Sequence, residues 1–123
     1  MILADTSVWA DHFRQADSKL SDGLARAEIV MHPFVLGEIA LGYLRRRADW
    51  LLRLGQLPSV HIAEPEEILA LIERQKLIAV GIGYVDMHLL ATTLVTPGCL
   101  LWTRDKRLAL VATRLGIAAE SIN

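Results

Sequence analysis

The sequence of 123 residues contains one cysteine, no long apolar run and no excess of charge of one sign. Because Cys99 is alone, an intramolecular disulfide is excluded, and its apolar neighbours Leu100-Leu101-Trp102 predict a buried thiol. No stretch approaches the ~18 uninterrupted apolar residues of a membrane-spanning helix. The first apolar run has no basic flank and is interrupted by Asp5, so no signal peptide is predicted. These absences favour a soluble, cytoplasmic protein.

Lysine and arginine total 13 and aspartate and glutamate total 14, which gives a formal net charge of −1. This balance excludes the histone-like or arm-like binding of nucleic acid that depends on bulk positive charge. Hydrophobic residues make up 53% of the chain, too many for a disordered protein and enough for one sizeable core. The length predicts a single domain over residues 1–123.

Short apolar runs alternate with segments of helical spacing. Three runs are typical of buried strands, namely Ile2–Ala4, Ile29–Met31 and Cys99–Trp102, and Val60–Ile62 suggests a fourth. Capping residues, prolines at first helical positions and apolar spacing predict helices near residues 7–14, 17–27, 33–44, 50–55, 65–72, 84–95 and 108–115. This alternation predicts an α/β layered domain around a parallel sheet.

Three aspartates stand where either a helix cap or a ligand site is expected. Asp5 ends the first predicted strand and Asp105 follows the last one, so both lie at the carboxyl edge of the sheet, where open α/β folds bind ligands. Asp86 lies in the first turn of its predicted helix, where the helix dipole also favours an acid. Taken alone, each of the three is also explained by helix capping.

Glu38 is unusual for another reason. On a helix it shares one face with Phe34 and Leu41, so that a carboxylate interrupts an apolar stripe. A buried carboxylate without a partner costs several kcal/mol or becomes protonated. Two interpretations follow: a buried ion pair, with Arg45 as the candidate partner, or a functional carboxylate.

The four carboxylates together are more informative than any one of them. If they converge, like charges at close range raise one another's pKa unless a cation enters. An all-oxygen ligand set selects hard divalent ions, Mg²⁺ or Mn²⁺, rather than zinc. A zinc site is not predicted, because the histidines are scattered and each is expected on the surface or in the core: His12, His32, His61 and His88.

In this order, with these flanking elements, the residues resemble the PIN domain. The resemblance rests on Asp5-Thr6-Ser7 after a hydrophobic start, Glu38 in mid-helix, Asp86 opening a late helix and Thr103-Arg104-Asp105 after a strand. The short length and the stretch Val35-Leu36-Gly37-Glu38 resemble the VapC-type toxins of prokaryotic toxin–antitoxin pairs, and the resemblance covers essentially the whole chain. It implies a PIN-like three-layer domain, a short and mostly parallel sheet flanked by helices. Met87 and His88 depart from the small or aliphatic residues common after the third acid, which puts the pocket's shape in question.

The resemblance also implies an activity, a metal-dependent endoribonuclease that acts as the toxin of a toxin–antitoxin pair. Carried over by position, Asp5, Glu38, Asp86 and Asp105 would bind Mg²⁺ or Mn²⁺ and support cleavage of RNA. Glu38 would ligate the ion or orient the attacking water. Thr103 would hydrogen-bond a ligand carboxylate or a metal-bound water.

An acidic pocket needs basic surroundings to attract RNA. Arg45-Arg46-Arg47 is the one basic run, and Arg104, Lys106 and Arg107 flank Asp105. Such short runs either bind phosphates close to the pocket or form solvated helix faces.

Two protein partners are implied by the resemblance, a second copy of the chain and a VapB-type antitoxin. A dimer surface is predicted around Trp9 and Leu36, and the tryptophans, which include Trp50 and Trp102, are expected in the core or an interface. An amphipathic antitoxin segment would lie along the helices at Pro33–Leu44 and Trp50–Leu54 and place an arginine in the acidic pocket.

Two other function classes remain open at this point. A receiver-like or dehalogenase-like phosphoryl-transfer domain also has an aspartate after its first strand. The receiver pattern needs a mid-chain acceptor, where only Asp49 is available, and the dehalogenase pattern needs an aspartate where this chain has Ser7. The second alternative is a non-catalytic α/β interaction module, against which the complete set of four acids argues.

Overall fold

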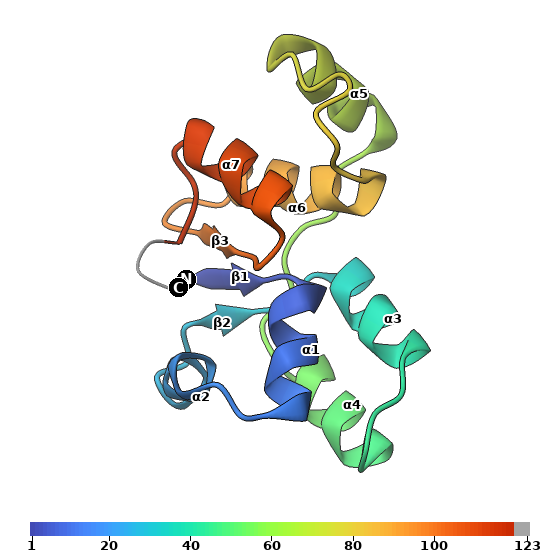
Figure 1. The fold of residues 1–123 in the computed structure, drawn as a ribbon, viewed down its shortest axis with the longest axis vertical. Helices are drawn as coiled ribbons and strands as arrows, with labels where there is room; N and C mark the ends of the chain where they lie inside the picture. Colours follow the sequence, from blue (N-terminus) through green and yellow to red (C-terminus); the bar gives the residue numbers. More distant parts are fainter. Residues whose placement is uncertain (120–123) are drawn as a thin grey trace.

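The computed structural model describes residues 1–119. Three strands form one parallel sheet in the order β2-β1-β3. Their bounds are β1 Ile2–Ala4, β2 Ile29–Val30 and β3 Leu100–Trp102. Because all three run in the same direction, their carboxyl ends meet at one edge of the sheet (Figure 1).

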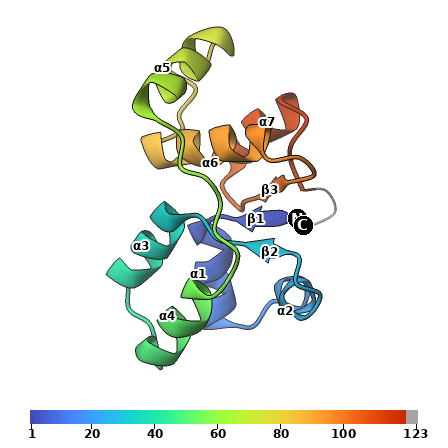
Figure 2. The ribbon, with the colours of Figure 1, turned by 180° about the vertical axis from the view of Figure 1, so that it is seen from behind.

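Seven helices lie around this sheet in the part of the chain that the structure describes. They are α1 Thr6–Arg14, α2 Ser18–Ala25, α3 Pro33–Leu41, α4 Arg47–Gly55, α5 Pro65–Arg74, α6 Tyr84–Val95 and α7 Lys106–Arg114. Helix α1 packs on β1 and α3, α2 packs on β2, and α6 packs on β3 and α5. Helices α4 and α5 lie at opposite ends of the long axis of the molecule, as Figures 1 and 2 show from the two sides. A short parallel sheet flanked by helices is the fold class that the sequence predicts, and it is confirmed.

The helices begin where the sequence supplies a side chain for the unpaired N–H groups of the first turn. The carboxylates of Asp5, Asp17 and Asp105 accept hydrogen bonds from the first-turn N–H groups of α1, α2 and α7. Helices α3 and α5 begin with Pro33 and Pro65, whose missing N–H group costs nothing at that position. Local signals of this kind explain why most predicted helices lie where they were expected.

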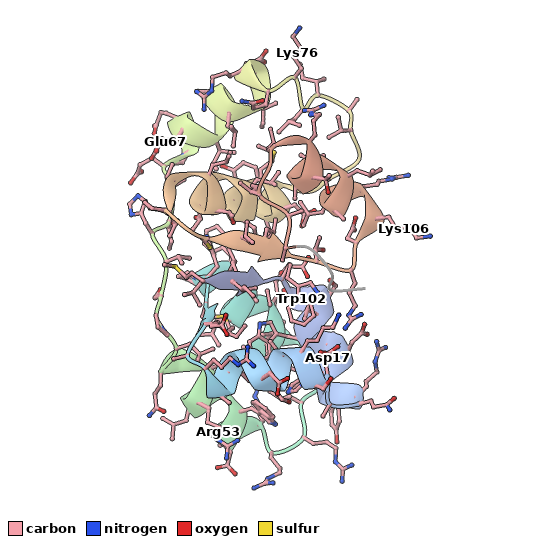
Figure 3. All side chains as sticks on the ribbon, turned by 90° about the vertical axis from the view of Figure 1, so that its left-hand side faces the viewer. Asp17, Arg53, Glu67, Lys76, Trp102 and Lys106 are labelled. Atoms are coloured by element: carbon pink, nitrogen blue, oxygen red, sulfur yellow. The ribbon has the colours of Figure 1, made fainter. Side chains whose placement is uncertain are left out.

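The core lies between the sheet and the helices that cover it. Fully buried side chains come from all layers, among them Leu3, Trp9, Leu89, Leu101 and Leu108. Cys99 is buried, as predicted, and Trp102 is buried at the end of β3. Most charged side chains lie outside, and Figure 3 shows Glu67 and Lys76 at the α5 end of the molecule and Arg53 at the α4 end.

Two predicted elements differ from the structure. Residues Val60–Ile62 are not a strand, and only Ser59 forms an isolated parallel bridge with Met31. Helix α3 ends at Leu41 rather than Leu44, because Gly42 adopts an extended conformation. No helix within residues 1–119 is long and apolar enough to cross a membrane.

Candidate functional site

Asp5 lies at the centre of the carboxyl edge of the sheet. Its N–H group donates to the carbonyl of Trp102 at 2.9 Å, which ties the end of β1 to the end of β3. Its side chain is 6% exposed. Oδ1 accepts hydrogen bonds from the hydroxyl and the N–H group (3.0 Å) of Ser7, and Oδ2 accepts one from the hydroxyl of Thr103 at 2.6 Å. The carboxylate therefore has a fixed orientation.

Asp105 is linked to Asp5 through one hydroxyl. The N–H group of Asp105 donates to Oγ1 of Thr103 at 3.0 Å, and that hydroxyl donates in turn to Asp5. Oδ1 of Asp105 accepts from the N–H groups of Arg107 (2.9 Å) and Leu108 (3.0 Å), so this aspartate also caps α7. Capping and membership of the site are thus compatible, because a cap occupies only one of the two carboxylate oxygens.

Asp86 reaches the same edge from the first turn of α6. Its Oδ2 accepts a hydrogen bond from the N–H group of Gly83 at 2.9 Å. Burial raises the pKa of Asp86, and the negative charges of Asp5 and Asp105 raise it further. Burial also raises the pKa of Asp5, against the opposing effect of the hydrogen bonds that it accepts. We call Asp5, Asp86 and Asp105 the acidic centre.

Glu38 differs from its predicted environment. It is exposed, and Leu41, which was expected on the same buried stripe, is 89% exposed. The buried ion pair with Arg45 is therefore wrong, and the hydroxyl of Thr6 donates to Oε1 of Glu38 at 2.6 Å instead. Since Thr6 follows Asp5 in the chain, this bond holds Glu38 beside the acidic centre.

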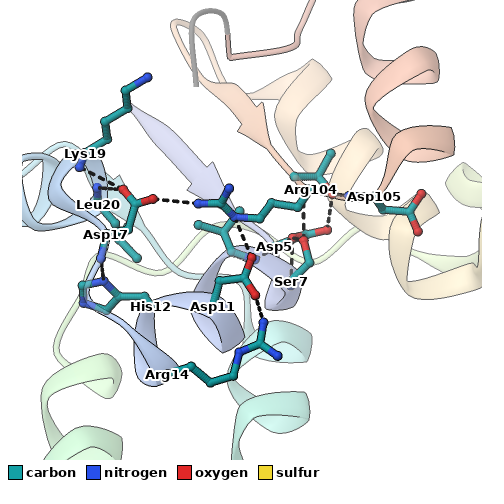
Figure 4. A network of polar contacts seen from close by, with 12 residues as sticks. Asp5, Ser7, Asp11, His12, Arg14, Asp17, Lys19, Leu20, Arg104 and Asp105 are labelled. Carbon is teal, nitrogen blue, oxygen red and sulfur yellow. Dashed lines mark hydrogen bonds and ion pairs between the residues drawn. The ribbon is translucent and has the colours of Figure 1, made fainter. Parts of the chain in front are cut away.

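No basic side chain within residues 1–119 forms an ion pair with the acidic centre or with Glu38. Arg104, which the sequence places next to Asp105, turns away from it. Its guanidinium pairs with Asp11 at 3.0 Å and with Asp17 at 2.7 Å (Figure 4). Arg14 also pairs with Asp11. We call these four residues the Arg104 network.

The donor chemistry of the acidic centre fits a hard divalent cation. Asp86, Asp105 and Glu38 each have one carboxylate oxygen that accepts no hydrogen bond from residues 1–119. Within the same residues, no three histidine, cysteine or acidic side chains lie close enough to hold an ion between them. A cation here would therefore be held by one or two of these carboxylates together with several waters, which is how Mg²⁺ is ordinarily bound.

The histidines take no part in this site. His12, His32 and His88 are buried and His61 is exposed, as surface or core residues are expected to be. Burial, together with the smaller effect of the neighbouring His88, lowers the pKa of His32 to about 4. Nδ1 of His32 accepts the N–H group of Phe34 at 3.0 Å and so caps α3.

A groove runs away from the acidic centre between α1, α3 and α4. Its volume is about 680 Å³, and Thr6 and Glu38 line one part of it. Apolar side chains, among them Phe13, Ile39 and Trp50, also line the groove, together with three arginines. The arginines are Arg14, Arg45 and Arg46. The groove thus combines apolar walls with positive charge beside the acids.

The sequence did not predict the contacts that Ser7 and Arg104 make next to the acidic centre. Ser7 donates to Asp5 and accepts the N–H group of Arg104 at 3.0 Å, so it links α1 to the segment after β3. The pairing of Arg104 with Asp11 and Asp17 was also missed. The sequence does show that Ser7 and Asp11 share one face of a helix, since they are one turn apart. Their common partner, Arg104, is nearly a hundred residues away in the chain, so the spacing alone does not identify it.

Comparison with known proteins identifies relatives over the whole length. A model of the PIN domain matches residues 2–113. Two relatives, both called Ribonuclease VapC32 and both from Mycobacterium tuberculosis (strains CDC 1551 / Oshkosh and ATCC 25618 / H37Rv), are each 40% identical to this chain over 124 aligned residues. The alignments cover 100% of this chain and 100% of each relative.

Proposed function

The chain belongs to the PIN domain family and, within it, to the VapC-type ribonucleases, and from this premise we propose that it is an endoribonuclease acting as the toxin of a toxin–antitoxin pair. The observation that carries the proposal is the acidic centre at the carboxyl edge of the sheet, where three carboxylates lie without a basic partner in the described chain. Residues 1–123 act as one domain in this proposal.

Asp5, Asp86, Asp105 and Glu38 are the residues that would hold a divalent cation, Mg²⁺ or Mn²⁺, one or two of them directly and the others through bound water. When bound, such an ion activates water as a nucleophile and neutralises charge on the scissile phosphate and leaving oxygen. A bound cation lowers the pKa of these carboxylates and so opposes the effect of burial, which raises it. The ion would thus supply the positive charge that balances the carboxylates of the acidic centre.

Thr103 orients Asp5 in this proposal, because its hydroxyl donates to the carboxylate at 2.6 Å while it accepts the N–H group of Asp105. Glu38, exposed and with one oxygen free, orients the attacking water or binds the ion directly. RNA approaches from the groove, where Arg45 and Arg46 bind backbone phosphates.

The test is cleavage of single-stranded RNA with Mg²⁺, with Mn²⁺ and with EDTA. Wild type cleaves in either metal and not in EDTA, Asp86→Asn does not cleave, and Asp22→Asn, an exposed acid of α2, cleaves like wild type. Undiminished cleavage in EDTA would contradict the metal mechanism. If wild type binds no divalent ion in calorimetry and cleaves no RNA, the chain is an interaction module instead.

A VapB-type antitoxin is the proposed inhibitor. An amphipathic segment of it lies in the groove between α1, α3 and α4, and one of its arginines pairs with the acidic centre. Because that arginine replaces the charge of the metal, antitoxin and metal compete. Raising Mg²⁺ weakens antitoxin binding more than a monovalent salt of equal ionic strength does. Equal affinity with and without Mg²⁺ would limit inhibition to covering the RNA surface.

A homodimer is also proposed, but not on the surface predicted from the sequence. Trp9 is 0% exposed and cannot form an interface, whereas Leu36 on α3 is partly buried against the core. Large apolar side chains are exposed at the end of the same helix, Leu41 at 89% and, just beyond it, Tyr43 at 92%. Sedimentation at high micromolar concentration tests the dimer, and a species of 13.7 kDa alone would contradict it.

A further inference from the structure

The side chain of Arg107 lies directly over the backbone of Gly81. A Cβ atom at residue 81 would stand 2.7 Å from both Cδ and Nη1 of Arg107 and 3.1 Å from its Cζ. Such distances are shorter than van der Waals contact, so a side chain at this position would displace the guanidinium. Gly81 also has a φ of +86°, which side-chain-bearing residues rarely adopt. Glycine therefore suits both this backbone conformation and the observed position of the Arg107 side chain.

This contact joins the two chain segments that hydrogen-bond to Asp105 and Asp86 of the acidic centre. Arg107 is in the first turn of α7, and its N–H group donates to Asp105. Gly81 stands two residues before Gly83, whose N–H group donates to Asp86. The Gly81 segment is anchored, because Val80 and Ile82 on either side of it pack against the core. Arg107 therefore lies on a segment that is fixed by packing. Only a few residues connect this segment to Asp86 and Arg107 to Asp105, so both stay close to the acidic centre.

The guanidinium of Arg107 has no acidic partner within residues 1–119. Three other arginines are occupied: Arg104 pairs with two aspartates, Arg47 donates to carbonyls at the end of α3, and Arg114 donates to the carbonyl of Gln75 at 2.6 Å. Arg107 is exposed, so its charge faces solvent beside the acids. A positioned guanidinium without an anion is suited to bind a phosphate with two hydrogen bonds.

We propose that Arg107, placed by Gly81, binds an RNA phosphate adjacent to the acidic centre and so sets the position of the strand. The proposal rests on the proposed ribonuclease function and adds a phosphate-binding residue on the α7 side of the site, opposite the groove. With the basic groove on one side and Arg107 on the other, an RNA strand crosses the carboxylates between two phosphate contacts. The scissile phosphate then lies between them.

The experiment measures binding of a fluorescent single-stranded RNA in EDTA, where no metal contributes, over a series of salt concentrations. Arg107→Ala weakens binding about threefold to tenfold at low salt and reduces the slope of log K against log salt by about 0.7, one phosphate contact to a single strand. Arg107→Lys retains the salt slope but loses affinity, because it keeps the charge and loses the fork. Arg26→Ala is the control, since it removes the same charge from the end of α2.

Gly81→Ala tests the positioning. It weakens RNA binding in the wild-type background and adds little in the Arg107→Ala background, a non-additive pair that a purely structural glycine would not produce. A wild-type affinity and slope for Arg107→Ala would overturn the proposal, as would equal losses in Arg107→Ala and Arg26→Ala. Failure of wild type to cleave RNA with metal would contradict the proposed function instead, and the salt slope in EDTA still reports on Arg107.

Discussion

Asp5 and Asp17 perform the same local task in opposite surroundings. Each stands one residue before a helix, and each accepts hydrogen bonds from two N–H groups of the first turn. Asp5 is buried among carboxylates, and burial raises its pKa. For Asp17 the burial effect is outweighed by the N–H groups of Leu20 and Lys19 and by the Arg104 guanidinium, so its pKa is lowered. Figure 4 shows the two aspartates on either side of Arg104.

The difference separates acids whose charge is compensated within the protein from acids whose charge is not. The Arg104 network supplies each acid with a cation, so its charges are compensated inside the protein. The acidic centre has three acids and no cation in the described chain, so its charge balance has to be completed from outside. Because Arg104 lies between Thr103 and Asp105 in the chain, a different direction of its side chain would have placed a positive charge beside the acids. Its capture by Asp11 and Asp17 keeps the acidic centre uncompensated.

The largest expected effect is on catalysis. Asp5→Asn should reduce RNA cleavage in Mg²⁺ by a factor on the order of 1,000, because loss of a metal ligand removes several kcal/mol of transition-state stabilisation. Asp17→Asn should cleave within about threefold of wild type, since Asp17 lies in the Arg104 network. Single-turnover cleavage rates measure both. A large loss in Asp17→Asn would show that the two regions are not separate.

Metal binding should distinguish the two regions in thermal unfolding. At ten times its dissociation constant, a bound ion stabilises the folded state by about 1.4 kcal/mol. Wild type and Asp17→Asn should therefore both show a higher Tm in Mg²⁺, whereas Asp5→Asn and Asp105→Asn should not respond. Monovalent salt of equal ionic strength is the control. A rise of equal size in Asp5→Asn would place the ion elsewhere.

Loss of the cation from the Arg104 network should cost stability rather than activity. Arg104→Ala removes two ion pairs between side chains that are 22–36% exposed, so solvent screening limits their combined contribution to about 0.5–1 kcal/mol. Urea unfolding in metal-free buffer measures the loss. Arg104→Ala should cause the same loss in the Asp5→Asn background as in wild type, because Asp5 and Arg104 do not share a charge partner. Strong coupling between the two substitutions would contradict this separation.

Most of the fold could be predicted because its signals are local. Aspartates and prolines mark helix starts, and apolar runs mark the strands, so the sequence alone assigns Asp5 and Asp105 to the same sheet edge. The exposure of Glu38 could not be predicted, because it depends on where α3 ends. In the described chain no other element covers the side chain of Leu41 at the end of that helix, which is almost fully exposed. The sequence left Trp9 open between the core and an interface, because its complete burial, stacked on Phe13, depends on tertiary packing that no local pattern encodes.

The contacts that define charge balance were the least predictable. Arg104 follows a candidate ligand in the chain, and proximity in sequence suggested a phosphate-binding role. Its direction depends on two aspartates of α1 and the α2 cap, 93 and 87 residues away. The contact between Arg107 and Gly81 likewise joins segments that no periodicity connects. Sequence patterns thus identify the acids, while the folded chain decides which of them remain without a cation.

The smallest expected effect has opposite signs in the two regions. An acid whose pKa is raised by folding binds more protons in the folded state, so it costs stability as pH rises from about 3.8 through the raised value. The free energy of unfolding of Asp5→Asn should therefore equal that of wild type at low pH and exceed it slightly at neutral pH without metal.

The pKa of Asp17 is lowered, so its contribution to stability is present above about 3.8 and lost as pH falls through the lowered value. Asp17→Asn should be less stable than wild type at neutral pH and match it in acid. Because asparagine is a good cap at both positions, the capping term is matched and the charge term remains. Unfolding free energies from pH 3 to pH 7 in EDTA measure both variants. A change in stability of the same sign for both variants at neutral pH would mean that the surroundings of Asp5 and Asp17 are electrostatically alike.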